Sequence, residues 1–415
     1  MIIKLKEFTR VEGSGAAEVV IENGEVKEVR LKILEGPRFF ELLTRGRYYY
    51  DVPDIEARIC AICYSSHSVA SVLAIERALE VEVPEEISLL RELALLGELL
   101  ESHALHLYLL VAPDLFGYSD AIRMVSKHGE IVREGITIKA FGNRIRELIG
   151  GREIHGINIK PGGFGRYPDA GELEAIGRES DVLLKSAKRA IELFAGVKPY
   201  GCVASHFLAT SEYLQGDSLI SREEEFQYFD GIEERSLVYS FAKRSLHHGE
   251  PFLVGALSRL LLKADMLTPG AKGFFERYRE KLETGYVSYN NLAQAIELVY
   301  CLERVREITG TLLDRGIKGE NVPVEVNGGG EGIGYVEAPR GVLVHHYRID
   351  RGGKVEYSNV ITPTAMNHAM IEASLLGEAK KLYDKADERK VVQRLEETVR
   401  AFDPCISCSV HVVRH

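Results

Sequence analysis

The stretch Arg-Ile-Cys-Ala-Ile-Cys at residues 58–63 and its counterpart Asp-Pro-Cys-Ile-Ser-Cys at residues 403–408 decide how this chain folds. Each holds two cysteines in a C-x-x-C spacing, which lets two thiolates converge on one ion within a single turn. Thiolates favour zinc, nickel or iron. We therefore expect Cys60, Cys63, Cys405 and Cys408 to meet at one metal site, although more than three hundred residues separate the two pairs.

The spacing alone leaves the kind of site open among a structural zinc site with four cysteines, a redox metal site and unlinked thiols. Zinc ribbons and fingers keep their pairs within a few tens of residues, unlike this chain. Six cysteines in a chain of this length do not make a disulfide framework in a reducing compartment. Cys202 and Cys301 stand alone, and we expect both to be small buried thiols.

Composition narrows the class of protein. The 415 residues are 45% hydrophobic, without a segregated polar stretch, which indicates one large compact body or two closely fused halves. A net charge of -10 argues against nucleic acid as a partner, because phosphate backbones are bound through clustered Lys and Arg. No run of eighteen uncharged apolar residues and no signal-like start occurs. We expect a cytoplasmic protein without membrane insertion.

Periodicity predicts a mainly α fold with minor β (α+β). Residues 17–33 alternate apolar and polar on both sides of Asn23-Gly24, a dipeptide suited to a tight hairpin turn. Helical patterns run over 84–111, 171–195, 286–309 and 366–402, which together indicate a bundle. The Gly-rich passages 160–166 and 328–334 are predicted to be turns or small irregular sheets.

Motifs along the whole chain resemble those of the nickel–iron hydrogenase large subunits. They occur in family order at residues 9–13, 58–67, 103–106, 113–114, 337–341, 363–367 and 403–411. The resemblance implies one large catalytic domain over residues 1–415. Its fold would be that of the hydrogenase large subunit, with a central bundle of long helices and a small N-terminal β-hairpin or sheet. Both cysteine motifs would converge on one metal site.

The resemblance also implies a nickel ion bound by all four cysteines and an iron that carries carbon monoxide and cyanide. Cys60 and Cys405 match the terminal nickel ligands, whereas Cys63 and Cys408 match the two that bridge to iron. Three further residues match the pocket around the diatomic ligands, where a hydroxyl and backbone groups bind cyanide: Pro339, Pro363 and Thr364.

Charged residues of the same motifs match the groups that act beside the metals. Arg340 matches the arginine that polarises dihydrogen over nickel, with a surface ion pair as the alternative. Asp114 and Asp403 match the carboxylates around it. A carboxylate beside a guanidinium fixes the orientation of that planar group through hydrogen bonds. Glu12 matches the family's proton relay, with an exposed carboxylate as the alternative.

A second metal site is implied near the C-terminus. Glu41 and His411 resemble ligands of a magnesium ion, which prefers oxygen ligands and waters. His67, His103 and His106 match family histidines that we interpret as hydrogen-bond donors orienting the thiolates. For His103 and His106, a structural histidine in the core is an equal alternative.

The expected activity is reversible heterolytic cleavage and formation of dihydrogen. The chain has neither a third cysteine cluster nor a dinucleotide fingerprint, so electrons should leave through an iron–sulfur small subunit. The ending is most similar to cytoplasmic NAD(P)-linked hydrogenases, some of which also reduce sulfur, and this implies diaphorase-type flavin and iron–sulfur subunits. Alternatives are a deazaflavin- or ferredoxin-linked hydrogenase and a structural zinc protein. The related quinone-pocket subunit of respiratory complex I lacks the four cysteines.

Overall fold

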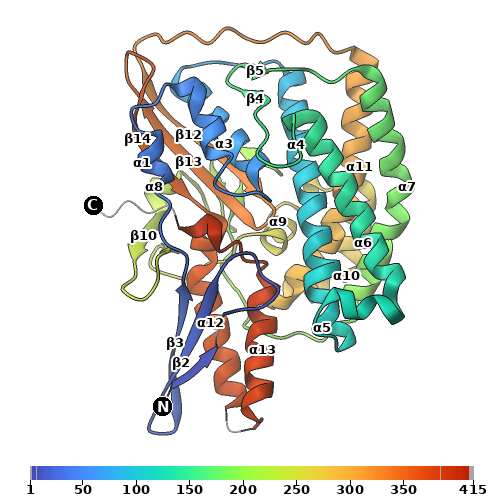
Figure 1. Cartoon of the computed structure of the whole chain (residues 1–415), viewed down its shortest axis with the longest axis vertical. Coiled ribbons are helices and arrows are strands. Elements are labelled where there is room, and N and C mark those ends of the chain that lie inside the picture. Colours follow the sequence, from blue (N-terminus) through green and yellow to red (C-terminus); the bar gives the residue numbers. More distant parts are fainter. Residues whose placement is uncertain (1, 6, 384, 411–415) are drawn as a thin grey trace.

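Long helices dominate the computed structural model, which describes residues 2–5, 7–383 and 385–410 (Figure 1). One side of the molecule is a helix bundle, and the other side holds small sheets with the helices that cover them. The predicted class, mainly α with minor β, is confirmed. The long helices of the bundle side are α4 (Glu85–Ala104), α6 (Ala121–Gly150), α7 (Ala170–Ala195), α10 (Pro269–Glu283) and α11 (Asn290–Arg315).

The helix predicted over 84–111 is confirmed. After α4, a π-helical segment (Leu105–Val111) and α5 (Ala112–Phe116) continue it. Glu85 and Glu86 lie in its first turn, where carboxylates interact favourably with the helix dipole. By length and composition the stretch Glu85–Phe116 could cross a membrane, but 83% of its most apolar window is buried inside the protein. It is therefore a core helix, packed on α6 and α11.

The helices predicted over 171–195 and 286–309 correspond to α7 and α11, which pack against each other. Helix α6 was not predicted from the sequence. Its first turn is capped by Asp120, whose carboxylate accepts a hydrogen bond from the backbone N–H of Arg123 at 2.9 Å. Helix α6 completes the bundle by packing along α4.

The prediction of one helix over 366–402 is wrong. The segment forms two helices, α12 (Pro363–Leu382) and α13 (Glu388–Ala401), that pack on each other. The second begins at Asp387, whose side chain accepts from the backbone N–H of Lys390 at 3.0 Å. An N-cap of this kind satisfies a free donor of the first turn and sets the start of a new helix.

The predicted N-terminal hairpin is confirmed. Strands β2 (Gly15–Glu22) and β3 (Glu25–Ile33) pair antiparallel, and β1 (Ile2–Leu5) adds to β2. Asn23 and Gly24 both adopt positive φ, 52° and 80°, as a two-residue hairpin turn requires. Helix α12 packs on β3, so the N-terminal sheet lies beside a helix from the C-terminal part of the sequence (Figure 1).

A four-stranded antiparallel sheet lies beside the bundle, in the order β14 (Val355–Ile361), β13 (Gly341–Ile349), β12 (Gly330–Ala338), β7 (Gln215–Gly216). Most of the Gly-rich passage 328–334, predicted as a turn or small irregular sheet, is the regular start of β12. Helix α3 (Tyr64–Ala78) lies directly on this strand. A Cβ atom on any of three alternate glycines would collide with the α3 backbone: Gly330, Gly332 and Gly334.

The remaining elements are short. The passage 160–166, predicted as a turn or small sheet, contains the hairpin β4 (Ile159–Lys160) and β5 (Gly163–Phe164). The others are α1 (Phe40–Thr44), α2 (Val52–Glu56), β6 (Ala209–Thr210), β8 (Leu219–Ile220), β9 (Glu225–Phe226), α8 (Tyr228–Gly231), β10 (Ile232–Ser236), β11 (Lys243–His247) and α9 (Ala256–Leu262).

Gly334→Ala tests the contact between strand and helix. The new methyl group would strike the carbonyl oxygen of Ala70 in α3, and backbone cannot yield as a flexible side chain does. We expect a loss of about 1–3 kcal/mol in the free energy of unfolding, measured by denaturant titration. Gly310→Ala is the control, because nothing lies within 4 Å of its Cβ position in the exposed part of α11. Equal effects of both substitutions would contradict the packing argument.

Candidate metal centre

The first cysteine pair lies in the loop between α2 and α3. Cys63 occupies the N-cap position of α3, and its backbone N–H donates to Sγ of Cys60 at 3.3 Å. The start of α3 is fixed by Glu98 of α4, whose buried carboxylate accepts from the backbone N–H of Ser65 at 2.7 Å. Packing of α3 on α4 and β12 therefore positions this pair.

The second pair follows α13. The chain turns at Asp403, which adopts a positive φ of 49°. The backbone N–H of Cys405 donates to the hydroxyl of Thr364 at the start of α12, at 2.9 Å. The next N–H, from Ile406, donates to the carbonyl of Glu12 at 3.0 Å. The C-terminal motif is thus held by α12 on one side and by the N-terminal segment on the other.

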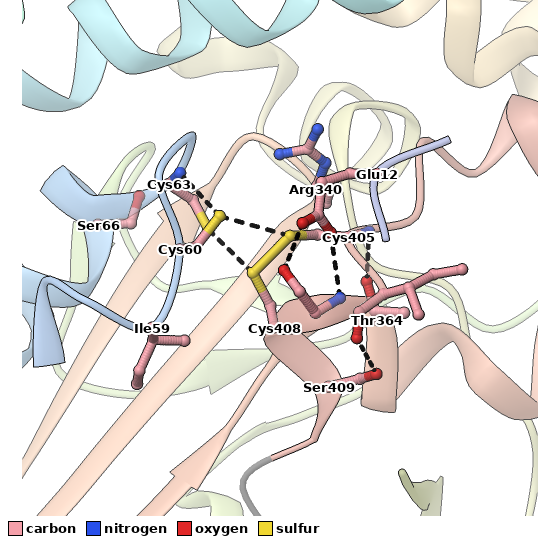
Figure 2. Close-up of a disulfide and its surroundings, with 12 residues drawn as sticks. Glu12, Ile59, Cys60, Cys63, Ser66, Arg340, Thr364, Cys405, Cys408 and Ser409 are labelled. Carbon is pink, nitrogen blue, oxygen red and sulfur yellow. Dashed lines mark hydrogen bonds between the residues drawn. A yellow bond between two sulfur atoms is a disulfide. The ribbon is translucent and has the colours of Figure 1, made fainter. Parts of the chain in front are cut away.

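All four sulfurs face one another, as predicted (Figure 2). Sγ of Cys60 lies 3.5 Å from Sγ of Cys405, Sγ of Cys63 lies 3.3 Å from Sγ of Cys408, and the four lie within 4.8 Å of one another. All four side chains are buried. Cys405 and Cys408 are joined by a disulfide, which must be reduced before these sulfurs bind metal, because the thiolate is the ligand.

The donor set fits a soft metal. Ligands of a tetrahedral ion with metal–sulfur bonds of about 2.3 Å lie about 3.8 Å apart. The distances between the two motifs, 3.5 Å from Cys60 to Cys405 and 3.3 Å from Cys63 to Cys408, are near this value. A hydrogen bond with Cys63 lowers the pKa of the Cys60 thiol, while its burial acts in the opposite direction. The lone cysteines fit the predicted role of small thiols, since Cys301 is fully buried and Cys202 is half-buried.

Arg340 lies at the turn from β12 to β13, close to the sulfurs (Figure 2). Its Nε donates to the backbone carbonyl of Asp403 at 2.9 Å, and its Nη2 lies 3.3 Å from Oδ1 of the same residue. The guanidinium is buried, so the alternative of a surface ion pair is wrong. Nη1 is buried and has no hydrogen-bond partner in the described part of the chain.

Glu12 reaches the C-terminal cysteine loop from the N-terminal segment. Its carboxylate accepts from the backbone N–H of Ser407 at 3.1 Å and from the Ser407 hydroxyl. Ser407 directly precedes Cys408 and lies two residues after Cys405, so the carboxylate is held at the loop that carries both sulfurs. The alternative of an exposed strand-end carboxylate does not fit this half-buried position.

The two predicted aspartates are in different places. Asp403 pairs with Arg340 and also accepts from the amide of Gln294 at 3.1 Å. Asp114 instead pairs with Arg400, at 2.9 Å from Nε, and with Arg10. Asp114 therefore holds the end of α13, from which Asp403 follows, and its expected place beside Arg340 stays a prediction.

A buried ion cluster that the sequence analysis missed fixes the backbone leading to Arg340. Arg259 of α9 donates to both carboxylate oxygens of Glu297 on α11 at 2.7 Å and pairs with Glu337 of β12 at 3.0 Å. It also donates to the carbonyls of Ala338 and Pro339, at 3.1 and 3.3 Å. A second cation pairs with Glu337 at 3.1 Å: Lys263.

The family histidines contact protein groups. His103 lies 2.9 Å from the carboxylate of Glu297, and Nδ1 of His106 lies 2.6 Å from the amide oxygen of Gln294. These contacts favour the structural interpretation of both. Nδ1 of His67 lies 3.0 Å from Nε2 of His345, and burial, the main cause, lowers the pKa of His67 to about 3. His67 is therefore neutral.

The candidate magnesium ligands are only partly described. The buried carboxylate of Glu41 accepts from the backbone N–H of Val360 at 3.0 Å. Glu56 lies close to the imidazoles of His67 and His345. Both oxygens of Glu56 are buried without a hydrogen-bond partner in the described part of the chain. His411 lies outside the described residues.

Glu297→Gln tests the ion cluster. Burial alone would raise the pKa of Glu297, but the charge and hydrogen bonds of Arg259, with those of His103, lower it to about 2. Since the unfolded chain takes up this proton near pH 4.5, the carboxylate stabilises the fold above that pH, and the contribution is lost as the pH falls toward 2. The variant should lose about 3–5 kcal/mol at pH 7 and lack this acid dependence.

Denaturant unfolding between pH 3 and 7 measures both effects. The control is Glu276→Gln, which removes an exposed ion pair with Arg279 and should change the free energy by less than about 0.5 kcal/mol. A Glu297→Gln chain as stable as this control would contradict the assignment.

Comparisons with known proteins agree with this geometry. The family description "Nickel-dependent hydrogenase" matches residues 38–148 and 204–411. Sulfhydrogenase 2 subunit alpha of Pyrococcus furiosus is 62% identical over the full length of both chains, and sulfhydrogenase 1 subunit alpha of the same organism is 39% identical over 99% of this chain and 98% of its own.

A solved structure of an NAD+-reducing [NiFe]-hydrogenase has a TM-score of 0.89 at 25% identity and covers 99% of each chain. The large-subunit fold is thereby confirmed. The four convergent cysteines hold a nickel–iron centre at which dihydrogen is oxidised or formed. This chain therefore belongs to the nickel-dependent hydrogenase family and is a catalytic subunit of a nickel–iron hydrogenase.

Proposed function

We propose that this subunit exchanges the electrons of dihydrogen with NAD(P) through an iron–sulfur small subunit and diaphorase-type flavin and iron–sulfur subunits. The similarity to the NAD+-reducing enzyme over 99% of the chain supports this acceptor. Apart from the four ligands, the described residues contain no cluster of cysteines for an iron–sulfur centre, so electrons must leave through another chain. The likeness to sulfhydrogenase subunits supports sulfur or polysulfide as a further acceptor of the whole complex.

We also propose that residues 1–415 act as one catalytic domain in the cytoplasm. Its metal ligands come from both ends of the sequence, so neither end forms the centre alone. Its most apolar helix is buried in the protein, which supports a chain that is not inserted in a membrane.

The observation that supports the proposed mechanism is that Nη1 of Arg340 has no hydrogen-bond partner among the described residues and lies near four buried cysteine sulfurs. When bound, the nickel–iron centre would supply the heterolytic cleavage of dihydrogen, and complete oxidation of one dihydrogen molecule releases two protons and two electrons. Arg340 holds a fixed positive charge over the reacting side, where low dielectric strengthens its field. Asp403 orients the guanidinium and keeps it from rotating away.

We propose that carbon monoxide and cyanide complete the coordination of the iron. Their pocket would be bounded by Arg340, Pro339, Pro363 and Thr364. Nη1 of Arg340 is available to donate to cyanide. The hydroxyl of Thr364 accepts from Cys405 and keeps its own proton for donation. A buried donor left without an acceptor is costly, which favours an acceptor at this place.

Glu12 is proposed as the first proton acceptor. Its two hydrogen bonds to Ser407 fix the carboxylate beside the cysteine loop, within reach of a thiol that has taken up a proton. We further propose that Glu41 and His411 hold a magnesium ion, because the carboxylate of Glu41 is buried and would supply a hard oxygen ligand.

Arg340→Lys tests the role of the guanidinium. An ammonium keeps the charge but lacks the planar fork that bonds Asp403 and reaches the ligands. Nickel and iron content and the infrared bands of carbon monoxide and cyanide should persist, while the rate of dihydrogen oxidation falls about 10²–10³-fold. A fully metallated variant with unaltered activity would show that Arg340 has no part in the reaction.

Glu12→Gln tests the proton route. The amide preserves the size of the side chain but cannot take up a proton, so isotope exchange between dihydrogen and heavy water should fall about 10²–10⁴-fold with metal content unchanged. Glu12→Asp keeps a carboxylate and should recover part of the exchange. If exchange in Glu12→Gln equals that of the unaltered enzyme, another group carries the proton.

A further inference from the structure

A second group of potential metal ligands lies at the β10–β11 hairpin, in a part of the chain to which neither cysteine motif contributes. His247 ends β11, His248 follows it in the turn, and Glu224 immediately precedes β9. Oε1 of Glu224 lies 2.9 Å from Nε2 of His248 and 3.5 Å from Nε2 of His247. One ligand atom from each residue lies within 4.8 Å of the other two.

The imidazole of His247 is prepared to act as a ligand. Its side chain is fully buried, yet Nε2 has no hydrogen-bond partner in the described part of the chain. The other nitrogen, Nδ1, lies 2.7 Å from Nε2 of His206. When Nδ1–H donates to His206, the lone pair of His247 is on Nε2 and points at Glu224 and His248. Metal-binding histidines are commonly oriented by such a hydrogen bond from the second nitrogen.

Gly231 lies directly against this nitrogen. A Cβ atom at Gly231 would lie 2.7 Å from Nε2 of His247, too close for any side chain. Gly231 is not among the glycines with positive φ, so its backbone does not require glycine. The absence of a side chain at Gly231 therefore allows the ring of His247 to occupy this position. Burial, with the neighbouring histidine charges, lowers the pKa of His247 to about 4, so its ring is neutral at pH 7.

We propose that Glu224, His247 and His248 bind a divalent transition-metal ion of the zinc type, separate from the nickel–iron centre. Two imidazoles and one carboxylate suit this class of ion, whereas magnesium prefers oxygen ligands alone. Ligand atoms about 2.0–2.1 Å from a tetrahedral ion lie about 3.3 Å apart, and the two distances to Glu224 bracket this value.

Water from solvent would fill the fourth position. The side chains of His248 and Glu224 are 59% and 40% exposed, so an ion reaches the site without unfolding. In the metal-free form, Nε2–H of His248 donates to the carboxylate of Glu224. Metal binding replaces this hydrogen bond, and the proton moves to Nδ1 of His248 or to solvent. His206 acts as a positioning residue through His247.

The test uses the purified complex with its nickel–iron centre, dialysed against chelator and titrated with zinc chloride against a chromophoric chelator. We expect one zinc ion per chain in addition to nickel and iron. His248→Ala and Glu224→Gln should each weaken this binding at least about tenfold. The matched control is Glu331→Gln, which removes the carboxylate that pairs with the single histidine His346. Zinc affinity in the control should equal that of the unaltered complex.

X-ray absorption at the zinc edge distinguishes this site from zinc in the cysteine cluster. Nitrogen and oxygen neighbours at about 2.0–2.1 Å with imidazole scattering support the proposal, whereas sulfur at about 2.3 Å assigns the zinc to the four cysteines and overturns it. Equal zinc affinity in His248→Ala, Glu224→Gln and Glu331→Gln overturns it as well, as does a complex that binds no additional zinc.

Discussion

The buried guanidinium of Arg259 is the contact on which the geometry of the centre depends. It joins α9 to α11 through Glu297 and to β12 through Glu337, and it holds the carbonyls of the two residues before Arg340. With Lys263, the cluster contains two cations and two anions, so its charges balance inside the protein. Replacing such a cluster with apolar groups often costs no stability, whereas removing one member leaves a charge unpaired. In this protein the ion cluster fixes the end of β12 and therefore the position of Arg340 beside the sulfurs.

The second constraint is that the ligands come from opposite ends of the chain. Cys60 and Cys63 are positioned by α3, which is seated on the glycines of β12, whereas Cys405 and Cys408 are positioned by Thr364 and the backbone of Glu12. The sulfurs converge only when the N-terminal segment, α12 and the loop after α13 are all in place. Metal binding is therefore coupled to the completion of the fold, because the unfolded chain holds no preformed site.

Local patterns predicted the features that depend on neighbouring residues. The turn at Asn23 and Gly24, the long core helix after Pro84 and the cysteine pairs all follow from spacing within a few residues. The break between α12 and α13 did not, since Lys385 and Ala386 favour a helix and the cap at Asp387 decides where the new helix begins. Long-range partners were equally hidden: nothing near Asp114 in the sequence shows that it pairs with Arg400. One signal was overlooked, namely a lone arginine at position 259 within an apolar helix.

The cation Arg340 and the carboxylate of Glu12 contact different parts of the loop that carries the C-terminal cysteines. The separation follows from the residues that each of them bonds. Arg340 is tied to the residue before the loop, Asp403, and its charge stays fixed because a guanidinium does not lose its proton in proteins. Glu12 is tied to the middle of the loop, at Ser407, by hydrogen bonds that a carboxylate can rearrange when it takes up a proton. In the proposed mechanism, a permanent cation that polarises dihydrogen and a carboxylate that exchanges protons need different supports. The rigid corner after β12 fixes Arg340. The Ser407 hydroxyl, whose proton can reorient, holds Glu12.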